Sequence, residues 1–110
     1  MIVLNIGHNP GFKVDFIKPV KRLIDLSKKY NIKLVISLEA NSIELIHPLL
    51  LERHEKLREL AQRNGIKVLD FHRYINSNPQ KDSGILWWDS VHLTDWGHQV
   101  AAEFFVEKLF

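Results

Sequence analysis

Short runs of β-branched and other apolar residues alternate along this chain with longer segments of helical periodicity. The three runs are Ile2–Ile6, Lys33–Leu38 and Ile66–Leu69. They are nearly continuous rather than alternating, which is typical of strands covered on both faces in a parallel sheet. Parallel neighbours need a crossover connection, and a helix usually supplies it. The pattern therefore predicts an α/β fold.

Two helical segments lie between these runs. The first begins near Pro19, because proline belongs in a first helical turn, and carries apolar residues at three-to-four spacing from Phe16 onward. The second spans Pro48–Asn64, and Gly65 supplies its stop, since glycine takes the left-handed conformation after a helix end. Both segments have the length and position of crossover helices.

A third helical segment, Asp95–Leu109, closes the chain, and Thr94 or Asp95 can cap it. The predicted order is strand, helix, strand, helix, strand, loop, helix, with residues 76–84 as the clear polar loop. This alternation implies right-handed crossovers and a three-layer α/β/α sandwich around a parallel sheet. The length of 110 residues fits a single domain, residues 1–110.

Composition excludes several classes of protein. Hydrophobic residues make up 45% and charged residues 25%, as in ordinary globular proteins. The net charge of +2 is too small to indicate a nucleic-acid partner without a motif. The absence of cysteine excludes disulfides, thiolate metal sites and cysteine nucleophiles. No apolar run approaches the roughly 18 residues that span a bilayer, so no membrane partner is expected.

The start of the chain, Met1–Ile6, reads directly as a strand. It lacks the basic region and cleavage site of a signal peptide. Because the chain begins inside a strand with no lead-in, we expect that something upstream is missing. The compartment stays open, with a cytoplasmic location expected if the chain is complete.

The segment Leu86–Ala102 contains an aspartate and a histidine three positions apart, Asp89 and His92, in a loop before the last helix. A carboxylate so close can accept the Nδ1 proton of the imidazole and leave Nε2 free as a base. In open α/β sheets, chemistry gathers at the carboxyl ends of the strands, where this loop would lie. The spacing alone is common, and a solvated surface histidine is its simpler interpretation.

Two blocks together resemble the SGNH/GDSL family of ester hydrolases. Asp89-Ser-Val-His92-Leu-Thr-Asp-Trp-Gly97 resembles the last block of the family, which opens the final helix and supplies two triad members. Gly7-His-Asn9 follows a strand, as the oxyanion block of the family does. The blocks occur in the family's order, about 80 residues apart. The resemblance covers the whole chain but only the C-terminal half of the family's domain, strands 3, 4 and 5 of a 2-1-3-4-5 sheet.

The resemblance implies a role for each of these residues. His92 would be the general base and Asp89 its orienter. Asn9 would donate to the oxyanion, a contribution of about 3 kcal/mol to the transition state, and Gly7 would let it point into the site. Gly97 would permit close packing at the start of the helix. The expected substrate is a small-molecule or carbohydrate ester, and neither a metal nor an organic cofactor is implied.

The chain departs from the family pattern in two ways. Pro10 stands where the family usually has aspartate. No Gly-Asp-Ser block occurs, so the nucleophile is absent, and the family's second block has no match either. Ser83 and Ser90 are the nearby hydroxyls, but Ser90 lies between Asp89 and His92 and is poorly placed for attack. The alternative function is therefore an inactive truncated or remnant module that acts in binding or assembly.

Trp87 and Trp88 immediately precede the aspartate. They are candidate substrate-binding residues that would wall an acyl or sugar pocket. A buried aromatic pair that supports the loop is an equal interpretation.

The remaining histidines have simpler interpretations than a metal site. His8 and His98 lack a third ligand at a recognisable spacing. His47 and His54 are seven positions apart, and exposed positions on a helix explain them better.

Polar residues also follow the second and third runs. Glu39, Asn41 and Glu44 come after the second and could touch substrate. After the third, His72 follows Asp70 closely, which favours a local hydrogen bond.

The first strand, Ile2–Ile6, would be an uncovered hydrophobic edge in the family's strand order. Such an edge invites pairing with another chain. We expect a separate N-terminal segment or a second copy of this chain, as a homodimer, to pair with it.

Overall fold

The computed structural model describes residues 1–7, 15–42, 48–81 and 84–110. The chain divides into two compact units, each made of two separate stretches. Unit 1 comprises Met1–Leu38 and Pro48–Leu69, and unit 2 comprises Glu39–His47 and Asp70–Phe110. The backbone therefore crosses from one unit to the other at each of these boundaries.

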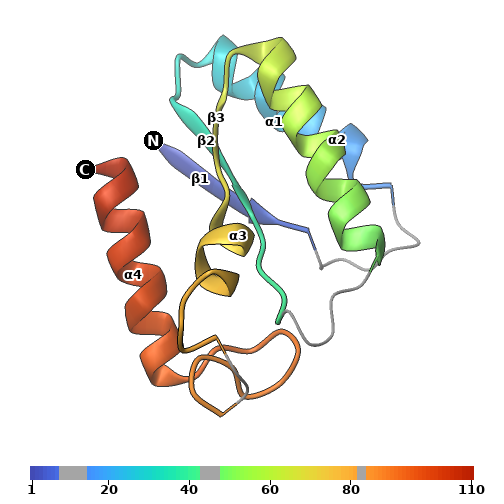
Figure 1. Ribbon diagram of the computed structural model, residues 1–110. Coiled ribbons are helices and arrows are strands. Elements are labelled where there is room, and N and C mark those ends of the chain that lie inside the picture. The colour runs from blue at the N-terminus through green and yellow to red at the C-terminus, as the bar shows by residue number, and fades with distance from the viewer. Residues whose placement is uncertain (8–14, 43–47, 82–83) are drawn as a thin grey trace. The chain divides into compact units, whose positions relative to one another are not determined.

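Unit 1 contains the sheet. Strands β1 (Ile2–Ile6), β2 (Leu34–Leu38) and β3 (Lys67–Leu69) are parallel and lie in the order β1-β2-β3 (Figure 1). Ile6 lies opposite Leu38, so β1 and β2 end at the same level. The predicted α/β fold with a parallel sheet is confirmed, and each strand begins and ends within one residue of its predicted bounds.

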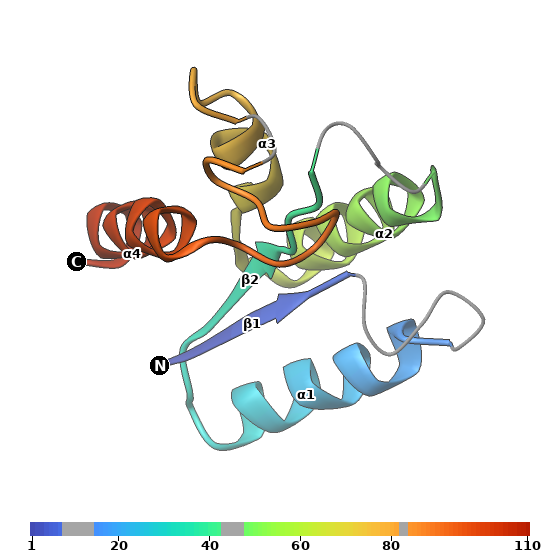
Figure 2. The ribbon, with the colours of Figure 1, turned by 90° about the horizontal axis from the view of Figure 1, so that it is seen from below.

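Helices α1 (Ile17–Lys29) and α2 (Pro48–Asn64) pack on one face of this sheet (Figures 1 and 2). Every second residue of β2 faces them, as the period of a strand requires. Burial of each aliphatic side chain there stabilises the fold by about 1.5–3 kcal/mol. The buried core of unit 1 consists of Phe16, Val20, Ile24, Leu34, Ile36, Leu38, Leu57 and Ala61.

The end of α2 forms at the predicted glycine. Gly65 has a φ of +64°, a conformation that costs glycine little because it has no Cβ. The N–H of Ile66 donates to the carbonyl of Ala61 at 2.9 Å, and the N–H of Gly65 donates to that of Gln62 at 3.3 Å. These two hydrogen bonds satisfy carbonyls that the helix end would otherwise leave open.

Two sequence expectations for unit 1 are wrong. The strands were expected to be covered on both faces, which holds for β2, but Ile2 and Val3 of β1 are each 38% exposed because β1 lies at the edge of the sheet. His54 was expected to be exposed and is only 1% exposed. It lies four residues after Leu50 and three before Leu57, so the helical period turns it to their buried face.

Unit 2 contains a short helix, α3 (Phe71–Asn76), which the sequence did not predict, and α4 (Asp95–Leu109), which it did. Asp70 caps α3, because its Oδ1 accepts the N–H of Arg73 at 2.9 Å. A helix of six residues has fewer than two turns, which is too short for periodicity to reveal.

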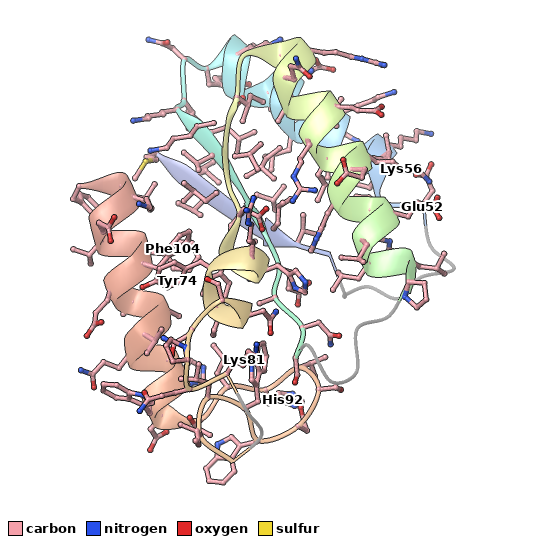
Figure 3. All side chains as sticks on the ribbon, in the orientation of Figure 1. Glu52, Lys56, Tyr74, Lys81, His92 and Phe104 are labelled. Carbon is pink, nitrogen blue, oxygen red and sulfur yellow. The ribbon has the colours of Figure 1, made fainter. Side chains whose placement is uncertain are left out.

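Aromatic rings join α3 to α4 within unit 2. The ring of Tyr74 lies 4.5 Å from that of Phe104 between centroids, and Figure 3 shows the two side chains pointing toward each other. Phe71 packs against Phe104 at 5.6 Å and against Phe105 at 5.3 Å. Such tilted contacts stabilise the packing beyond the burial of apolar area.

Among the helices of the described ranges, none is both long and apolar enough to cross a bilayer.

Candidate active site

The loop before α4 brings Asp89 and His92 into direct contact; they are called the Asp–His pair below. Asp89 Oδ2 lies 2.7 Å from His92 Nδ1, and Figure 3 labels the histidine. Because an ionised carboxylate can only accept, the proton of this hydrogen bond lies on Nδ1. The other oxygen, Oδ1, accepts the backbone N–H groups of Val91 and His92, both at 2.8 Å. The N–H of Trp88 donates to the carbonyl of His92 at 2.8 Å and closes the loop.

Three hydrogen bonds lower the pKa of Asp89 from 3.8 to about 2. The N–H of Val91 contributes most, followed by the imidazole of His92 and then its N–H. All three donate to the charged form and therefore favour it. Both side chains face solvent, with 54% of Asp89 and 74% of His92 exposed. The carboxylate is thus ionised at neutral pH, and the imidazole is accessible.

Thr94 and Gly97 fix the junction between this loop and α4. Thr94 Oγ1 caps the helix by accepting the N–H of Gly97 at 3.0 Å, as predicted. The N–H of Thr94 donates to the carbonyl of Leu86 at 3.0 Å. A Cβ on Gly97 would overlap that carbonyl oxygen and come within 3.1 Å of the Leu93 side chain. The expected close packing at this glycine is therefore present.

The segment after β2 holds the middle of the loop. The carbonyl oxygen of Ser90 accepts Nδ2 of Asn41 at 2.6 Å and the N–H of Ser42 at 2.8 Å. The sequence marked Asn41 as a residue that could touch substrate, but its side chain is only 1% exposed and binds the protein instead. Glu39 is partly exposed, and Glu44 lies outside the described residues.

Asn41 in turn contacts α3. Its N–H donates to His72 Nδ1 at 3.2 Å, and its carbonyl accepts Nδ2 of Asn76 at 2.8 Å. The same Asn76 nitrogen donates to the carbonyl of His72 at 3.0 Å. The sequence expected a local hydrogen bond for His72, and Asn76, four positions away, supplies one. The contact with Asn41 joins residues 31 positions apart and was not expected.

The two tryptophans differ in exposure. Trp87 is 1% exposed and forms an antiparallel bridge with Leu93. Its burial fits the interpretation that it supports the loop and argues against direct contact with substrate. Trp88 is 70% exposed and directly precedes Asp89. Of the two tryptophans, only Trp88 exposes its ring to solvent beside the Asp–His pair.

In unit 1, the residue that follows β1 is held by a buried arginine. Gly7 is buried, and its carbonyl accepts Nη1 of Arg53 at 2.6 Å. Arg53 is 5% exposed, and its guanidinium lies 4.6 Å from the ring centroid of Phe16. Sequence reasoning missed this arginine. The predicted oxyanion donor, Asn9, lies outside the described residues, as do residues 8, 10, 47 and 83.

The described residues contain no cluster of three or more histidine, cysteine, aspartate or glutamate side chains that could hold a metal ion. His98 Nδ1 lies 2.9 Å from the carbonyl of Thr94 in the first turn of α4.

Comparison with known proteins finds one similar solved structure. No protein family model and no curated protein matches this chain. A solved structure, described as the crystal structure of an acetyl xylan esterase, AlAXEase, is similar with a TM-score of 0.79 and 24% sequence identity. The similarity covers 98% of this chain and 66% of that one. At this identity the likeness shows an esterase-like α/β fold, and this chain spans just under two thirds of the length of the solved protein.

Proposed function

We propose that this chain supplies the Asp–His part of a serine-type ester hydrolase of the SGNH/GDSL class, corresponding to the C-terminal half of such a domain. The contact of 2.7 Å between Asp89 Oδ2 and His92 Nδ1 carries the proposal. It keeps the proton on Nδ1, so Nε2 is the basic nitrogen. The low pKa of Asp89, about 2, keeps the orienting carboxylate charged wherever the imidazole acts as a base.

The proposed reaction has two steps. A serine hydroxyl attacks the ester carbonyl carbon while His92 Nε2 takes its proton, and a tetrahedral oxyanion forms. On collapse the bond to the alcohol breaks, and the alcohol leaves with the proton from His92. Water then attacks the acyl-enzyme in the same way, so the acid is released and the serine regains its hydrogen. Asp89 stabilises the imidazolium in both steps.

The serine would come from outside these 110 residues, since the sequence holds no Gly-Asp-Ser block. The resemblance assigns the oxyanion donor to Asn9 and the tight turn before it to Gly7. A donor of this kind is worth a factor of about 10² to 10³ in kcat.

For the substrate we propose an acetylated carbohydrate. Two observations support this choice: the similar solved protein is named an acetyl xylan esterase, and Trp88 exposes 70% of its surface next to Asp89. An indole ring has the apolar face on which the C–H groups of a sugar stack.

The second candidate is a module without catalysis that acts in binding or assembly. The missing Gly-Asp-Ser block and Pro10 in place of aspartate favour it for the chain taken alone.

The hydrolysis of p-nitrophenyl acetate by this chain reconstituted with the segment that supplies the serine, and by the same protein with His92→Ala, tests the proposal. With the Asp–His pair at work, the variant loses at least about a hundredfold in rate, the usual value of a general base. His98→Ala, a histidine exposed in the first turn of α4, is the matched control and keeps its rate. Equal rates for all three reconstituted proteins would contradict the proposed role of His92 and favour the second candidate.

A further inference from the structure

Asn41 is a buried residue that the proposed reaction does not use. Its backbone N–H, its backbone carbonyl and its side-chain amide each form a hydrogen bond. Its N–H donates to His72 Nδ1, and its carbonyl accepts Nδ2 of Asn76. Its own Nδ2 donates to the carbonyl oxygen of Ser90 at 2.6 Å. With 1% exposure, the whole side chain is removed from solvent.

Ser90 links this network to the Asp–His pair, because it lies between the two residues in the chain. Within this turn, the carboxylate of Asp89 accepts hydrogen bonds from the N–H groups of Val91 and His92. Asn41 holds the same turn from a segment 49 positions earlier in the sequence.

The Asp–His pair cannot fix its own geometry firmly. Its side chains are 54% and 74% exposed, and a hydrogen bond between side chains that face water constrains them weakly. The hydrogen bond from Asn41 to Ser90 has a buried donor and is partly buried as a whole, so less water competes for it. We propose that Asn41 is a positioning residue: its side-chain amide anchors the Ser90 carbonyl and so keeps Asp89 and His92 in the arrangement that proton transfer needs. The purpose of this positioning, proton transfer, rests on the proposed function. The geometry that Asn41 maintains does not depend on that function.

The environment of Asn41 Oδ1, the oxygen of the same side-chain amide, supports this role. Among the described residues, Oδ1 has no hydrogen-bond partner although it is buried. An acceptor buried without a partner disfavours folding. An apolar side chain of the same shape would therefore serve the fold about as well. The donor that the amide supplies to Ser90 explains its presence better than stability does.

The variant Asn41→Leu separates the two roles, since leucine has a similar shape and leaves the backbone hydrogen bonds in place. Imidazole ¹⁵N shifts show which nitrogen of His92 carries the proton. We expect the Nδ1–H form in the wild type and a mixture of both tautomers in the variant. We also expect the amides of Val91 and His92 to exchange with solvent about tenfold faster or more.

Ser37→Ala is the matched control. Ser37 Oγ is also buried without a hydrogen-bond partner among the described residues, and it lies on β2 in unit 1. This variant keeps the wild-type tautomer of His92 and the same exchange rates. An Asn41→Leu protein that is folded and indistinguishable from the wild type in both readouts would overturn the proposal.

A measurement on the wild type covers the case in which Asn41→Leu does not fold. If the amides of Val91 and His92 exchange as fast as in an unstructured peptide, the loop is not anchored and the proposal fails. None of these readouts depends on hydrolysis. If the chain shows the expected exchange but His92→Ala keeps full esterase activity in the form reconstituted with the serine segment, the proposed function is refuted and the positioning role stays intact.

Discussion

At the scale of single residues, the carboxylate of Asp89 has the most clearly perturbed chemistry. It accepts hydrogen bonds from two backbone N–H groups and one imidazole, and its pKa falls to about 2. All three donors belong to one short turn, so local hydrogen bonds and not burial lower this pKa. The pKa of this residue therefore reports whether the turn is formed.

Asp89 makes stability depend on pH in a defined direction. Its folded pKa, about 2, lies below the ordinary value of 3.8. The stabilisation is therefore complete above pH 3.8 and is lost as the pH falls through about 2. Urea unfolding of the wild type and of Asp89→Asn should differ at neutral pH and converge in acid. Asp25→Asn, at an exposed position on α1, controls for the change in charge. A difference that stays constant with pH would contradict this account.

At Gly97, the addition of a single methyl group should destabilise the protein. Alanine normally stabilises a helix by up to about 1 kcal/mol over glycine. Here its Cβ would overlap the carbonyl oxygen of Leu86, which Thr94 holds in place with a hydrogen bond. Overpacking of this kind costs about 1–3 kcal/mol, so we expect Gly97→Ala to lower the free energy of unfolding. Urea denaturation checks it, with the exposed Gln99→Ala as control. A more stable Gly97→Ala protein would refute the predicted overlap.

At the scale of elements, aromatic rings pack between α3 and α4 in unit 2. Phe104 is 3% exposed and touches the rings of Phe71, Tyr74 and Phe105. We expect Phe104→Ala to cost about 3–5 kcal/mol in the free energy of unfolding, because it removes a buried ring and leaves a cavity. Phe110→Ala removes a ring that is 93% exposed and should change stability little. Equal effects of the two substitutions on thermal unfolding would contradict this role of the cluster.

The long elements could be predicted from the sequence because each contains its own signal. Pro48–Asn64 ends at a glycine, and Asp95–Leu109 begins after a threonine cap, so both helices have the predicted bounds. Helix α3 has only six residues, and its one local signal is the cap at Asp70. The burial of His54 follows from its spacing to Leu50 and Leu57, although polarity suggested the opposite.

The candidate site also contains one contact that the sequence could suggest and one that it could not. The contact between Asp89 and His92 spans three positions, so spacing alone could suggest it. The hydrogen bond from Asn41 to Ser90 spans 49 positions and joins two residues with no shared motif. No local pattern in a sequence encodes such a contact, and only the folded chain reveals it. The contact between Asn41 and Ser90 was therefore out of reach of sequence reasoning, whereas the contact within the Asp–His pair was not.

At the scale of the whole molecule, the outer edge of β1 has no neighbouring strand among those described. Ile2 and Val3 are each 38% exposed there, and an apolar open edge favours strand addition. We propose that a separate N-terminal segment or a second copy of this chain pairs with it. The chain alone should then be dimeric by light scattering at a few tens of micromolar. Val3→Lys should make it monomeric, whereas Val106→Lys on α4 should not. A monomeric wild type at this concentration would refute the proposal.

The discontinuity of the two units affects how this protein could exchange parts with others. Asp70–Phe110 contains Asp89 and His92 but not Asn41 or Ser42, which are encoded before α2. A recombination event that moved only the C-terminal stretch would transfer the Asp–His pair without the residues that bind the carbonyl of Ser90. Grafting this loop onto another scaffold therefore requires two separate insertions. Gene shuffling at one crossover point would instead produce chimeras in which the pair is present but unanchored.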